Sequence, residues 1–282
     1  MRPRGLLKYQ AVASTPLPPE DWDVEPLFAQ GDRVVMYGDF GALKSWVVLD
    51  LAIHLARGRG DWLGWKIPRS RKVLFIDEEE TLHELQRRVR KLALGRGWEG
   101  EDLPLRLLHR PGFAFGPRGT LDLVEYLRGE DWFPEVVIVE TLSMTLDGNE
   151  ADNAAVNQMW RRAGVLVEAG ATVLITHHMN KPGWGPASHQ RPVRHQIRGA
   201  TSILAGCDAG YAVQRTLRPQ VSTLTGVKCR GAKLDAPVTL QLVDVGEGVC
   251  VQTLTPHVIV PGSPSANGQH GFSGLPPEPP RS

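Results

Sequence analysis

The sequence predicts a mostly parallel, doubly wound α/β sheet with an antiparallel extension at its C-terminal end. Three observations predict this fold class. Strand-like and helix-like segments alternate from residue 32 to residue 178, which is typical of a parallel sheet. The strand-like segments are continuous apolar runs, as expected for strands that are covered on both faces. After residue 210 the runs alternate apolar and polar residues, and Val245–Gly248 is typical of a hairpin turn, so these strands should be antiparallel.

Each element follows from its residue pattern. The segment from Thr81 to Leu94 has apolar residues three and four positions apart, as an amphipathic helix requires. Gly170 suits the end of a long helix, because glycine accommodates the left-handed position after the last turn. We therefore expect strands at 32–38, Lys72–Glu79, Leu105–His109, Glu135–Glu140, Ala171–His178, Gly210–Gln214, Ser222–Lys228, Val238–Val245 and Val249–Leu254, and helices at 44–57, Thr81–Leu94, Gly119–Arg128, Ala151–Ala169 and Gly199–Ala205.

The length of 282 residues suits one large α/β domain with short additions. Residues 1–30 contain several prolines and acids, and we expect an irregular lead-in that packs loosely on the core. Residues 31–255 should form the domain itself. Residues 256–282 are rich in glycine, proline and serine, so we expect a disordered tail.

The composition is that of an ordinary globular protein, with 41% hydrophobic and 22% charged residues and a net charge of +1. No run approaches 18 apolar residues, and the N-terminus has no signal-peptide core, so we expect no membrane association. The three cysteines are far apart and form no C-x-x-C pair. We therefore expect a cytoplasmic protein with reduced thiols and no zinc site.

A glycine-bearing turn between the first strand and the first helix has the spacing of a P-loop: Gly38, Gly41 and then Lys44-Ser45. In such a turn, backbone N–H groups and a helix N-terminus surround phosphate oxygens, the lysine reaches the outer phosphates, and the hydroxyl binds Mg²⁺. The sequence therefore predicts a site for ATP and Mg²⁺. Its nucleotide-binding residues are Gly38, Asp39, Phe40, Gly41, Ala42, Leu43, Lys44, Ser45 and Trp46.

Leu43 departs from the P-loop pattern, because the second required glycine normally stands at this position. The backbone closes tightly on the phosphate there and can need a positive φ, which strains a leucine. We interpret the turn as a phosphate site, since the strand, both other glycines, the lysine, the serine and the helix are all present. The alternative is an ordinary glycine-containing turn between a strand and a helix.

Four segments that are far apart in the sequence should meet at one edge of the sheet. The carboxyl ends of parallel strands lie together, and ligands of open α/β sheets bind there. The segments at these ends are Gly38–Ser45, Asp77–Glu79, Glu140 and His177–His178. The two histidines alternate faces on a strand, so we expect one in the packing and one toward the phosphates.

Positive charge is concentrated between Ala169 and Leu234, a stretch that contains nine lysines and arginines and only one acid, Asp208. These cations would make a positive surface if they folded onto one face; the alternative is a solvated face without a partner. We take Lys181, Arg191 and Arg194 as candidates for binding single-stranded DNA. Tryptophans at positions 46, 62 and 65 are expected to serve in packing rather than in base contacts.

These segments together resemble the RecA-type ATPases of the RepA group, the hexameric replicative helicases of plasmids and phages with their AAA-family relatives. The resemblance covers about residues 21–255 and rests on five motifs in order. The motifs are Gly38–Trp46, Val73–Glu79, Val136–Ser143 with Asn149, Asp152 and Asn153, Ile175–His178, and Arg198–Ser202.

The resemblance implies a RecA-like P-loop fold and a role for each matching residue. Lys44 and Ser45 would bind the outer phosphates and Mg²⁺, and Glu140 would stand at the Walker B position as a metal ligand, where the family usually has aspartate. The remaining implied roles are the acid that orients the attacking water (Glu78, with Glu79 as the second candidate), the γ-phosphate sensor (His178), an arginine finger toward a neighbouring subunit (Arg198), and a further arginine at the subunit interface or the nucleotide (Arg88).

Two functions from different classes follow from this resemblance. The leading one is an Mg²⁺-dependent ATPase that forms a ring, a hexamer in the family, and acts on single-stranded DNA as a replicative helicase or replication-associated ATPase. The second is a nucleotide-binding regulatory or loading factor for DNA replication or repair, whose hydrolysis is attenuated by Leu43 and Glu140. A nucleotide-independent interaction protein is a third, weaker possibility. Other replication proteins would be further partners.

Overall fold

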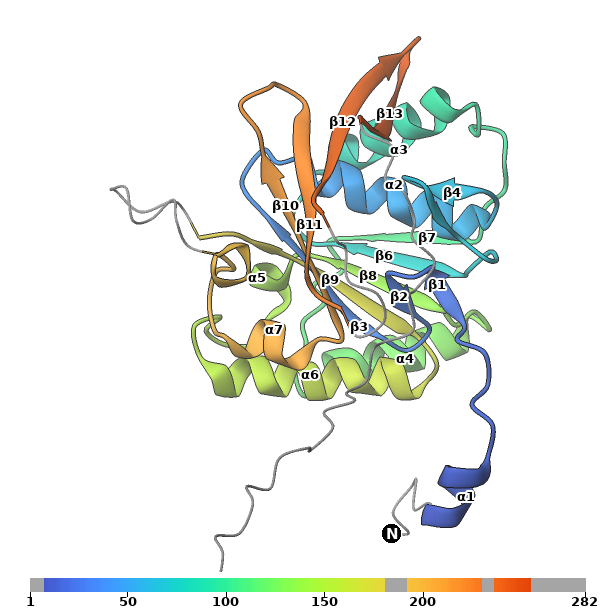
Figure 1. The fold of residues 1–282 in the computed structure, drawn as a ribbon, viewed down its shortest axis with the longest axis vertical. Coiled ribbons are helices and arrows are strands. Elements are labelled where there is room, and N and C mark those ends of the chain that lie inside the picture. The colour runs from blue at the N-terminus through green and yellow to red at the C-terminus, as the bar shows by residue number, and fades with distance from the viewer. Residues whose placement is uncertain (1–7, 181–191, 230–235, 255–282) are drawn as a thin grey trace, which may run out of the picture.

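One central sheet extends through the structure. The computed structural model describes residues 8–180, 192–229 and 236–254. Nine strands of this described part pair in the order β13-β12-β11-β10-β3-β9-β8-β6-β7 (Figure 1). Their bounds are β3 Arg33–Gly38, β6 Val73–Asp77, β7 Leu105–His109, β8 Val136–Glu140, β9 Thr172–His178, β10 Ala209–Arg215, β11 Val221–Lys228, β12 Val238–Val245 and β13 Gly248–Thr253.

The strand directions confirm the predicted fold class. Strands β10, β3, β9, β8, β6 and β7 are all parallel. Strands β11, β12 and β13 continue the sheet antiparallel from β10. The antiparallel extension therefore begins one strand later than the residue pattern indicated, because β10 pairs with β3 on one side and turns back through β11 on the other. This is a RecA-like arrangement in which β9 separates β3 from β8.

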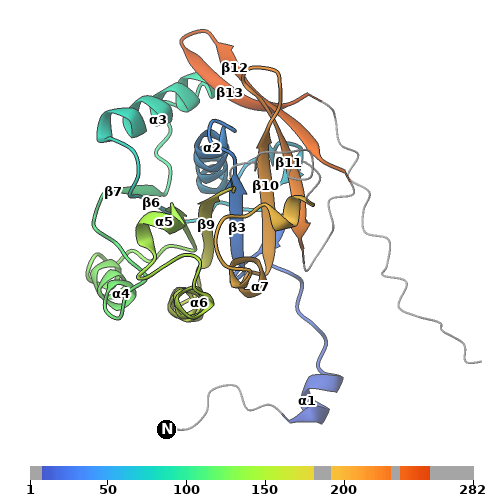
Figure 2. The ribbon, with the colours of Figure 1, turned by 90° about the vertical axis from the view of Figure 1, so that its left-hand side faces the viewer.

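Helices cover both faces of the sheet (Figure 2). One face packs against α2 and α3, and its core also includes apolar residues of β12 and β13. The other face packs against α4, α6 and α7. The continuous apolar sequences of β3, β6, β8 and β9 follow from this double coverage, since nearly all their residues are buried, whereas the edge strand β7 is partly exposed. The helices are α1 Tyr9–Ser14, α2 Lys44–Arg57, α3 Leu82–Arg96, α4 Gly119–Gly129, α5 Leu142–Thr145, α6 Asn153–Glu168 and α7 Ser202–Gly206, with a 3₁₀ turn at Val193–His195.

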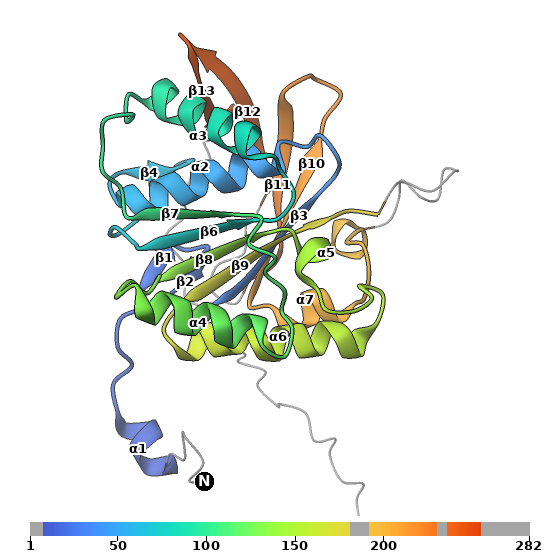
Figure 3. The same ribbon diagram turned by 180° about the vertical axis from the view of Figure 1, so that it is seen from behind.

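Helix α3 and the β12–β13 hairpin lie side by side (Figure 3). Their backbones touch at two glycines: a Cβ on Gly95 would lie 2.2 Å from the carbonyl oxygen of Val249, and one on Gly248 would lie 2.1 Å from the nitrogen of Gly95. Arg96 donates to the carbonyl of Val251 at 2.7 Å. The C-terminal strands thus support the helix that follows the acidic segment after β6.

Residues 22–29 correct the prediction of a loosely packed lead-in. They form two short strands, β1 (Trp22–Val24) and β2 (Phe28–Ala29), which pair with each other. Val24 and Phe28 are buried in the core. The prolines and acids suggested an irregular segment, but burial of these apolar side chains against α2 and the sheet decides the structure here. The predicted tail at 256–282 lies outside the described residues.

Other local features agree with the pattern or add to it. Trp62 and Trp65 are buried in the small β4–β5 hairpin (Asp61–Trp62 and Trp65–Lys66), as the packing prediction requires. Gly170 follows α6 with φ of 103°, so it occupies the expected left-handed position. Helix α5 was not predicted, because four residues are too few for a periodic pattern. Within the described residues, no helix has the length and apolar character needed to cross a membrane.

A buried arginine connects the N-terminal segment to the sheet. Arg71 is fully buried, and its Nε lies 2.7 Å from a carboxylate oxygen of the equally buried Asp23. It also contacts Asp21 at 2.7 Å and Gln30 at 2.7 Å. Arg69, two positions earlier, reaches Asp21 and Glu135 as well, but its side chain is 45% exposed.

These two arginines give a matched test of burial. Arg71→Met removes the buried guanidinium that binds Asp23, Asp21 and Gln30 and leaves these polar groups without their donor, so we expect the free energy of unfolding to fall by about 3–5 kcal/mol. Arg69→Met removes exposed pairs, and we expect a loss below about 1 kcal/mol. Urea unfolding followed by circular dichroism at pH 7 measures both. Equal losses in the two variants would contradict the structural role given to Arg71.

Candidate functional site

The P-loop segment connects β3 to α2 at the carboxyl edge of the sheet. Gly38 is required there, because a Cβ would lie 2.4 Å from the carbonyl oxygen of Val213 on β10. Leu43 has φ of 63° and ψ of 10°, so the position is left-handed, as the P-loop pattern predicts. A leucine in this region costs about 1–2 kcal/mol relative to a right-handed conformation. The turn therefore has P-loop backbone geometry without the usual glycine.

A cavity of about 310 Å³ lies over the N-terminus of α2. The helix N-terminus provides unpaired N–H groups and a partial positive charge, which together favour phosphate. The cavity combines the P-loop with side chains from the segment after β6, from α3 and from the end of β9. Its lining is Asp39, Phe40, Gly41, Ala42, Leu43, Lys44, Ser45, Trp46, Glu79, Glu80, Arg88 and His178. All the predicted nucleotide-binding residues except Gly38, which forms the strand end, belong to this lining.

The buried carboxylate of Glu140 contacts both reactive groups of the P-loop. Its Oε1 lies 3.1 Å from Lys44 Nζ and accepts a hydrogen bond from Ser45 Oγ at 2.5 Å. Glu140 ends β8, and the peptide bond that follows it is cis. Lys44 and Glu140 are 7% and 2% exposed, so each charge is largely shielded from water and depends on the other.

The donor set around Ser45 fits Mg²⁺. The ion takes oxygen ligands in a near-octahedral shell and usually keeps several waters, with one or two protein groups and the phosphates completing it. The hydroxyl of Ser45 and the carboxylate of Glu140 are oxygen donors already in contact with each other. In the described part of the chain, no group of three or more His, Cys, Asp or Glu residues could hold a metal by itself. The metal would therefore share its ligands between these two residues and the nucleotide.

The two candidate acids both line a pocket with Arg110, Gly112 and Met144, but only Glu79 also lines the cavity over α2. Glu78 accepts a hydrogen bond from the backbone N–H of Phe113 at 2.5 Å and does not line the cavity. Glu79 lines the cavity. Burial raises the pKa of Glu79, the charge of Lys44 opposes this rise, and Glu140 and Asp77 add to it. A carboxylate with a raised pKa is a better proton acceptor, so Glu79 suits the water-orienting role better than Glu78, which the resemblance placed first.

Comparison with known proteins agrees with this geometry. A family model described as an AAA domain matches residues 5–183. The chain belongs to the AAA domain family. A search of curated proteins found no match. Family membership makes the chain an ATPase of the AAA, RecA-like type, and such ATPases bind nucleotide, typically with Mg²⁺. The cavity over α2 is the candidate nucleotide site of this AAA domain.

Arg88 stands in the wall of the candidate nucleotide site. Its guanidinium pairs with Glu80 at 2.9 Å and with Glu84 at 2.8 Å, and it lies 5.4 Å from the ring centroid of Trp46. Of the two places that the resemblance allowed, the structure places Arg88 at the nucleotide cavity. Trp46 differs from the packing prediction, because it packs partly on the core and also lines the cavity. Residue spacing gave no sign that Glu80 would join this wall.

The two histidines at the end of β9 face opposite ways. His177 is buried, contacts the carbonyl of Arg198 through Nε2 at 2.9 Å, and has a pKa lowered by burial to about 4. His178 lines the cavity, and its pKa is lowered first by burial and then by the charge of Lys44. His178 is therefore mainly neutral at pH 7, so its imidazole can both donate and accept a hydrogen bond. The burial of His177 confirms the packing half of the expected division, and contact of His178 with a phosphate stays a prediction.

Arg198 does not line the cavity of its own chain. Its side chain pairs with Glu150 through Nε at 2.5 Å and through Nη2 at 2.9 Å. Its backbone N–H donates to the carbonyl of His178 at 3.1 Å, which places the arginine beside the cavity. An arginine finger acts on a neighbouring chain, so this role of Arg198 stays a prediction. The pairing with Glu150 was not predicted, because no spacing rule connects residues 48 positions apart.

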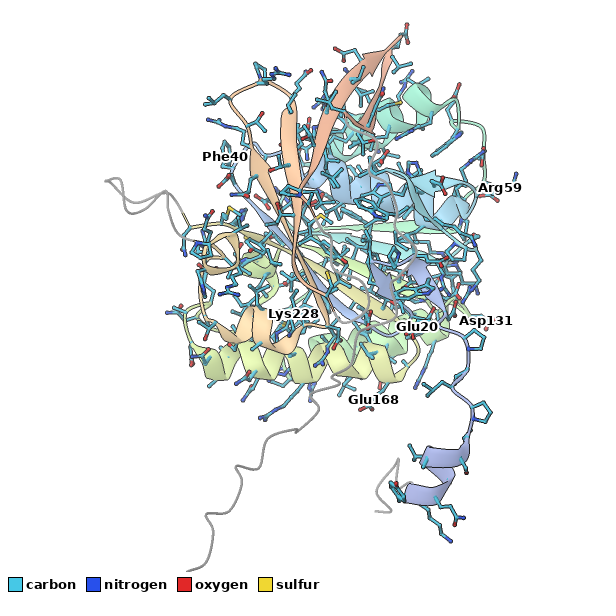
Figure 4. The ribbon with its side chains drawn as sticks, in the orientation of Figure 1. Glu20, Phe40, Arg59, Asp131, Glu168 and Lys228 are labelled. Carbon is cyan, nitrogen blue, oxygen red and sulfur yellow. The ribbon has the colours of Figure 1, made fainter. Side chains whose placement is uncertain are left out.

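The predicted DNA-binding cations are only partly described. Lys181 and Arg191 lie outside the described residues, and Arg194 is exposed in the 3₁₀ turn. Among the described cations, Lys228 lies at the opposite end of the sheet from Phe40 of the cavity lining (Figure 4), and it donates to the carbonyls of Leu204 and Ala205 at 2.8 and 2.9 Å. Met179 follows His178 of the cavity lining and pairs with Ile197. Both ends of the segment that includes Arg194 are therefore anchored next to the cavity.

The two glutamates can be separated by isosteric variants. Glu79→Gln keeps the size of the side chain but removes the proton acceptor, so we expect ATP turnover to fall by about 10²–10⁴-fold. Glu78→Gln keeps an oxygen that can accept from Phe113, so turnover should stay within about threefold of the unchanged chain. Steady-state phosphate release measures both, with binding of a fluorescent ATP analogue as the control for folding. A larger loss in Glu78→Gln would restore the order of the sequence prediction.

Proposed function

We propose that this AAA domain is an Mg²⁺-dependent ATPase that assembles into a ring, a hexamer, and acts on single-stranded DNA as a replicative helicase or replication-associated ATPase. The observation that supports it most is the convergence of Lys44, Glu79 and His178 on one cavity, with Glu140 in contact with Lys44. These residues come from four strand ends, and each matches a part that phosphoryl transfer requires: phosphate binding, metal binding, water orientation and charge sensing.

The chemistry of the proposed reaction asks the chain mainly to position groups and neutralise charge. The N–H groups of the P-loop and the amino group of Lys44 would bind the outer phosphates. Mg²⁺, when bound by Ser45 and Glu140, would neutralise charge on the phosphate oxygens. Glu79 would orient the attacking water and accept its proton, and the neutral imidazole of His178 would contact the terminal phosphate. Arg88 and Glu80 would close the side of the cavity toward α3.

Two features support the ring and the DNA partner. The described lining holds one arginine, Arg88, which already pairs with Glu80 and Glu84. Arg198 is half-exposed beside His178, and the same arginine of a second copy, acting as a finger, would supply further positive charge. The chain between Met179 and Ile197 starts and ends beside His178, and it contains the candidates Lys181, Arg191 and Arg194. A DNA contact in this segment would be linked through the chain to His178, the proposed sensor of the terminal phosphate.

Turnover with and without single-stranded DNA tests the proposed function. We expect DNA to stimulate ATP hydrolysis, and the stimulation to weaken steeply with salt, because phosphate contacts release counterions. Lys44→Ala should lower hydrolysis by at least about 100-fold under both conditions, since it removes the cation that binds the outer phosphates. Lys66→Ala is the matched control, because the side chain of Lys66 is 67% exposed and does not line the cavity.

Tight binding of MgATP without turnover would favour the second function, a regulatory or loading factor for DNA replication or repair. Absence of any specific MgATP binding would contradict both functions. The ring is checked in the same preparation by light scattering with and without nucleotide. A monomer under all conditions would contradict the ring, and with it the finger role of Arg198.

The left-handed Leu43 is the observation that favours the second function, because strain in the P-loop can weaken the phosphate site. We expect Leu43→Gly to change turnover by less than about threefold, since the backbone already has the geometry that glycine would adopt. Gln220→Gly is the control for glycine in a left-handed position, since Gln220 has φ of 57° in an exposed turn. A large rise in turnover in Leu43→Gly alone would show that the natural site is attenuated.

A further inference from the structure

A buried aspartate organises the acidic segment that follows β6. Asp77 is the last residue of β6 and is 1% exposed. Its Oδ1 accepts hydrogen bonds from the backbone N–H groups of both Glu79 and Glu80, each at 2.9 Å. A short polar side chain that binds N–H groups two and three residues ahead stops the strand and forms a turn. The two acids after it therefore leave the extended conformation of β6.

The turn determines which glutamate faces the cavity. With the N–H groups of Glu79 and Glu80 directed back to Asp77, the side chain of Glu79 lines the cavity. The side chain of Glu78 instead reaches the N–H of Phe113. If β6 continued as a strand, the side chains of positions 78 and 79 would point to the two opposite faces of the sheet. The turn is therefore what directs Glu79 to the cavity.

Neighbouring strand ends hold the rest of the turn. The N–H of Glu78 donates to the carbonyl of Glu140 at 2.8 Å, and the N–H of Arg110 donates to the carbonyl of Asp77 at 2.7 Å. The guanidinium of Arg110 donates to the carbonyl of Glu79 at 2.7 Å. These bonds fix carbonyl groups and one N–H, whereas the N–H groups of Glu79 and Glu80 depend on Asp77. Its carboxylate is therefore the contact that sets the orientation of the Glu79 peptide.

The hydrogen bonds that Asp77 accepts come from the backbone of the turn. Asp77 does not belong to the lining of the cavity, and its second oxygen, Oδ2, is buried without a hydrogen-bond partner among the described atoms. Leaving a buried carboxylate oxygen unpaired costs free energy. A residue retained at that cost, next to the proposed proton acceptor, is better explained by a positioning role than by stability alone.

We propose that Asp77 is a positioning residue of the ATPase, which holds the peptide of Glu79 so that the Glu79 carboxylate meets the attacking water. The proposal rests on the proposed hydrolysis of ATP at this cavity. It predicts an effect on the chemical step that passes through Glu79, with little effect on binding of MgATP.

The test is a double-mutant cycle between positions 77 and 79. Asp77→Ala should lower kcat by about 10–100-fold, because misplacing a catalytic group by about 1 Å costs this much. KM for MgATP should change by less than about threefold, which is within about 0.7 kcal/mol. In the Glu79→Gln background, Asp77→Ala should cause no further loss in kcat. Asp77→Asn keeps an oxygen at the Oδ1 position and should recover most of the activity.

A matched control separates positioning from general turn stability. The side chain of Asp32 accepts the N–H of Ala29 at 2.9 Å, so it stabilises a turn by the same chemistry just before the amino end of β3. Asp32→Ala should lower Tm and leave kcat unchanged. The inference is wrong if Asp77→Ala leaves kcat unchanged, or if it lowers kcat equally with and without Glu79. Either of these results, with normal ATP turnover in the unchanged chain, would overturn this inference alone. Absence of ATP turnover in the unchanged chain would overturn the proposed function as well, so the two failures are distinguishable.

Discussion

The contact of Glu140 with Lys44 and Ser45 is the interaction on which the candidate site depends. A lysine at the start of α2 and a glutamate at the end of β8 lose most of their hydration, and a buried charge without a partner costs several kcal/mol. In this fold the pair forms because β3, β9 and β8 are neighbours in the sheet and their ends lie together at its carboxyl edge. The strand order and register of the sheet provide this arrangement. The site therefore requires the central sheet as a whole.

The same sheet divides chemically similar neighbours into different roles. Of the four acids at positions 77–80, Asp77 forms a turn, Glu78 binds a loop, and Glu79 and Glu80 line the cavity. Of the two histidines that end β9, one is buried and neutral, and the other lines the cavity. Arg88 and Arg198 are each held by acids, but only Arg88 reaches the cavity of its own chain. For the acids and the histidines, these differences come from side-chain direction at strand ends, where the alternation of a strand gives way to turns. Arg88 lies instead on α3, and Arg198 lies in the segment before α7.

Membership of the AAA domain family and the geometry of the cavity agree on an ATPase at a general level. Leu43 and Glu140, the two residues that depart from the usual motifs, both fit the geometry of the site. Leu43 adopts the left-handed backbone that glycine would adopt, and Glu140 extends far enough to contact both Lys44 and Ser45. The P-loop geometry is thus retained with different residues, and its consequence for turnover is a question of rate rather than of fold.

The sequence by itself determined the fold class, the order of the main strands and helices, and the meeting of Gly38–Ser45 with Glu140 at one edge. Apolar periodicity and the parallel topology set these features, and both are local or general properties. Tertiary structure alone decided the burial of residues 22–29, the parallel pairing of β10, and the choice of Glu79 over Glu78 for the cavity. These depend on contacts between residues distant in the chain, such as Asp23 with Arg71 and Glu78 with Phe113, for which residue spacing carries no signal.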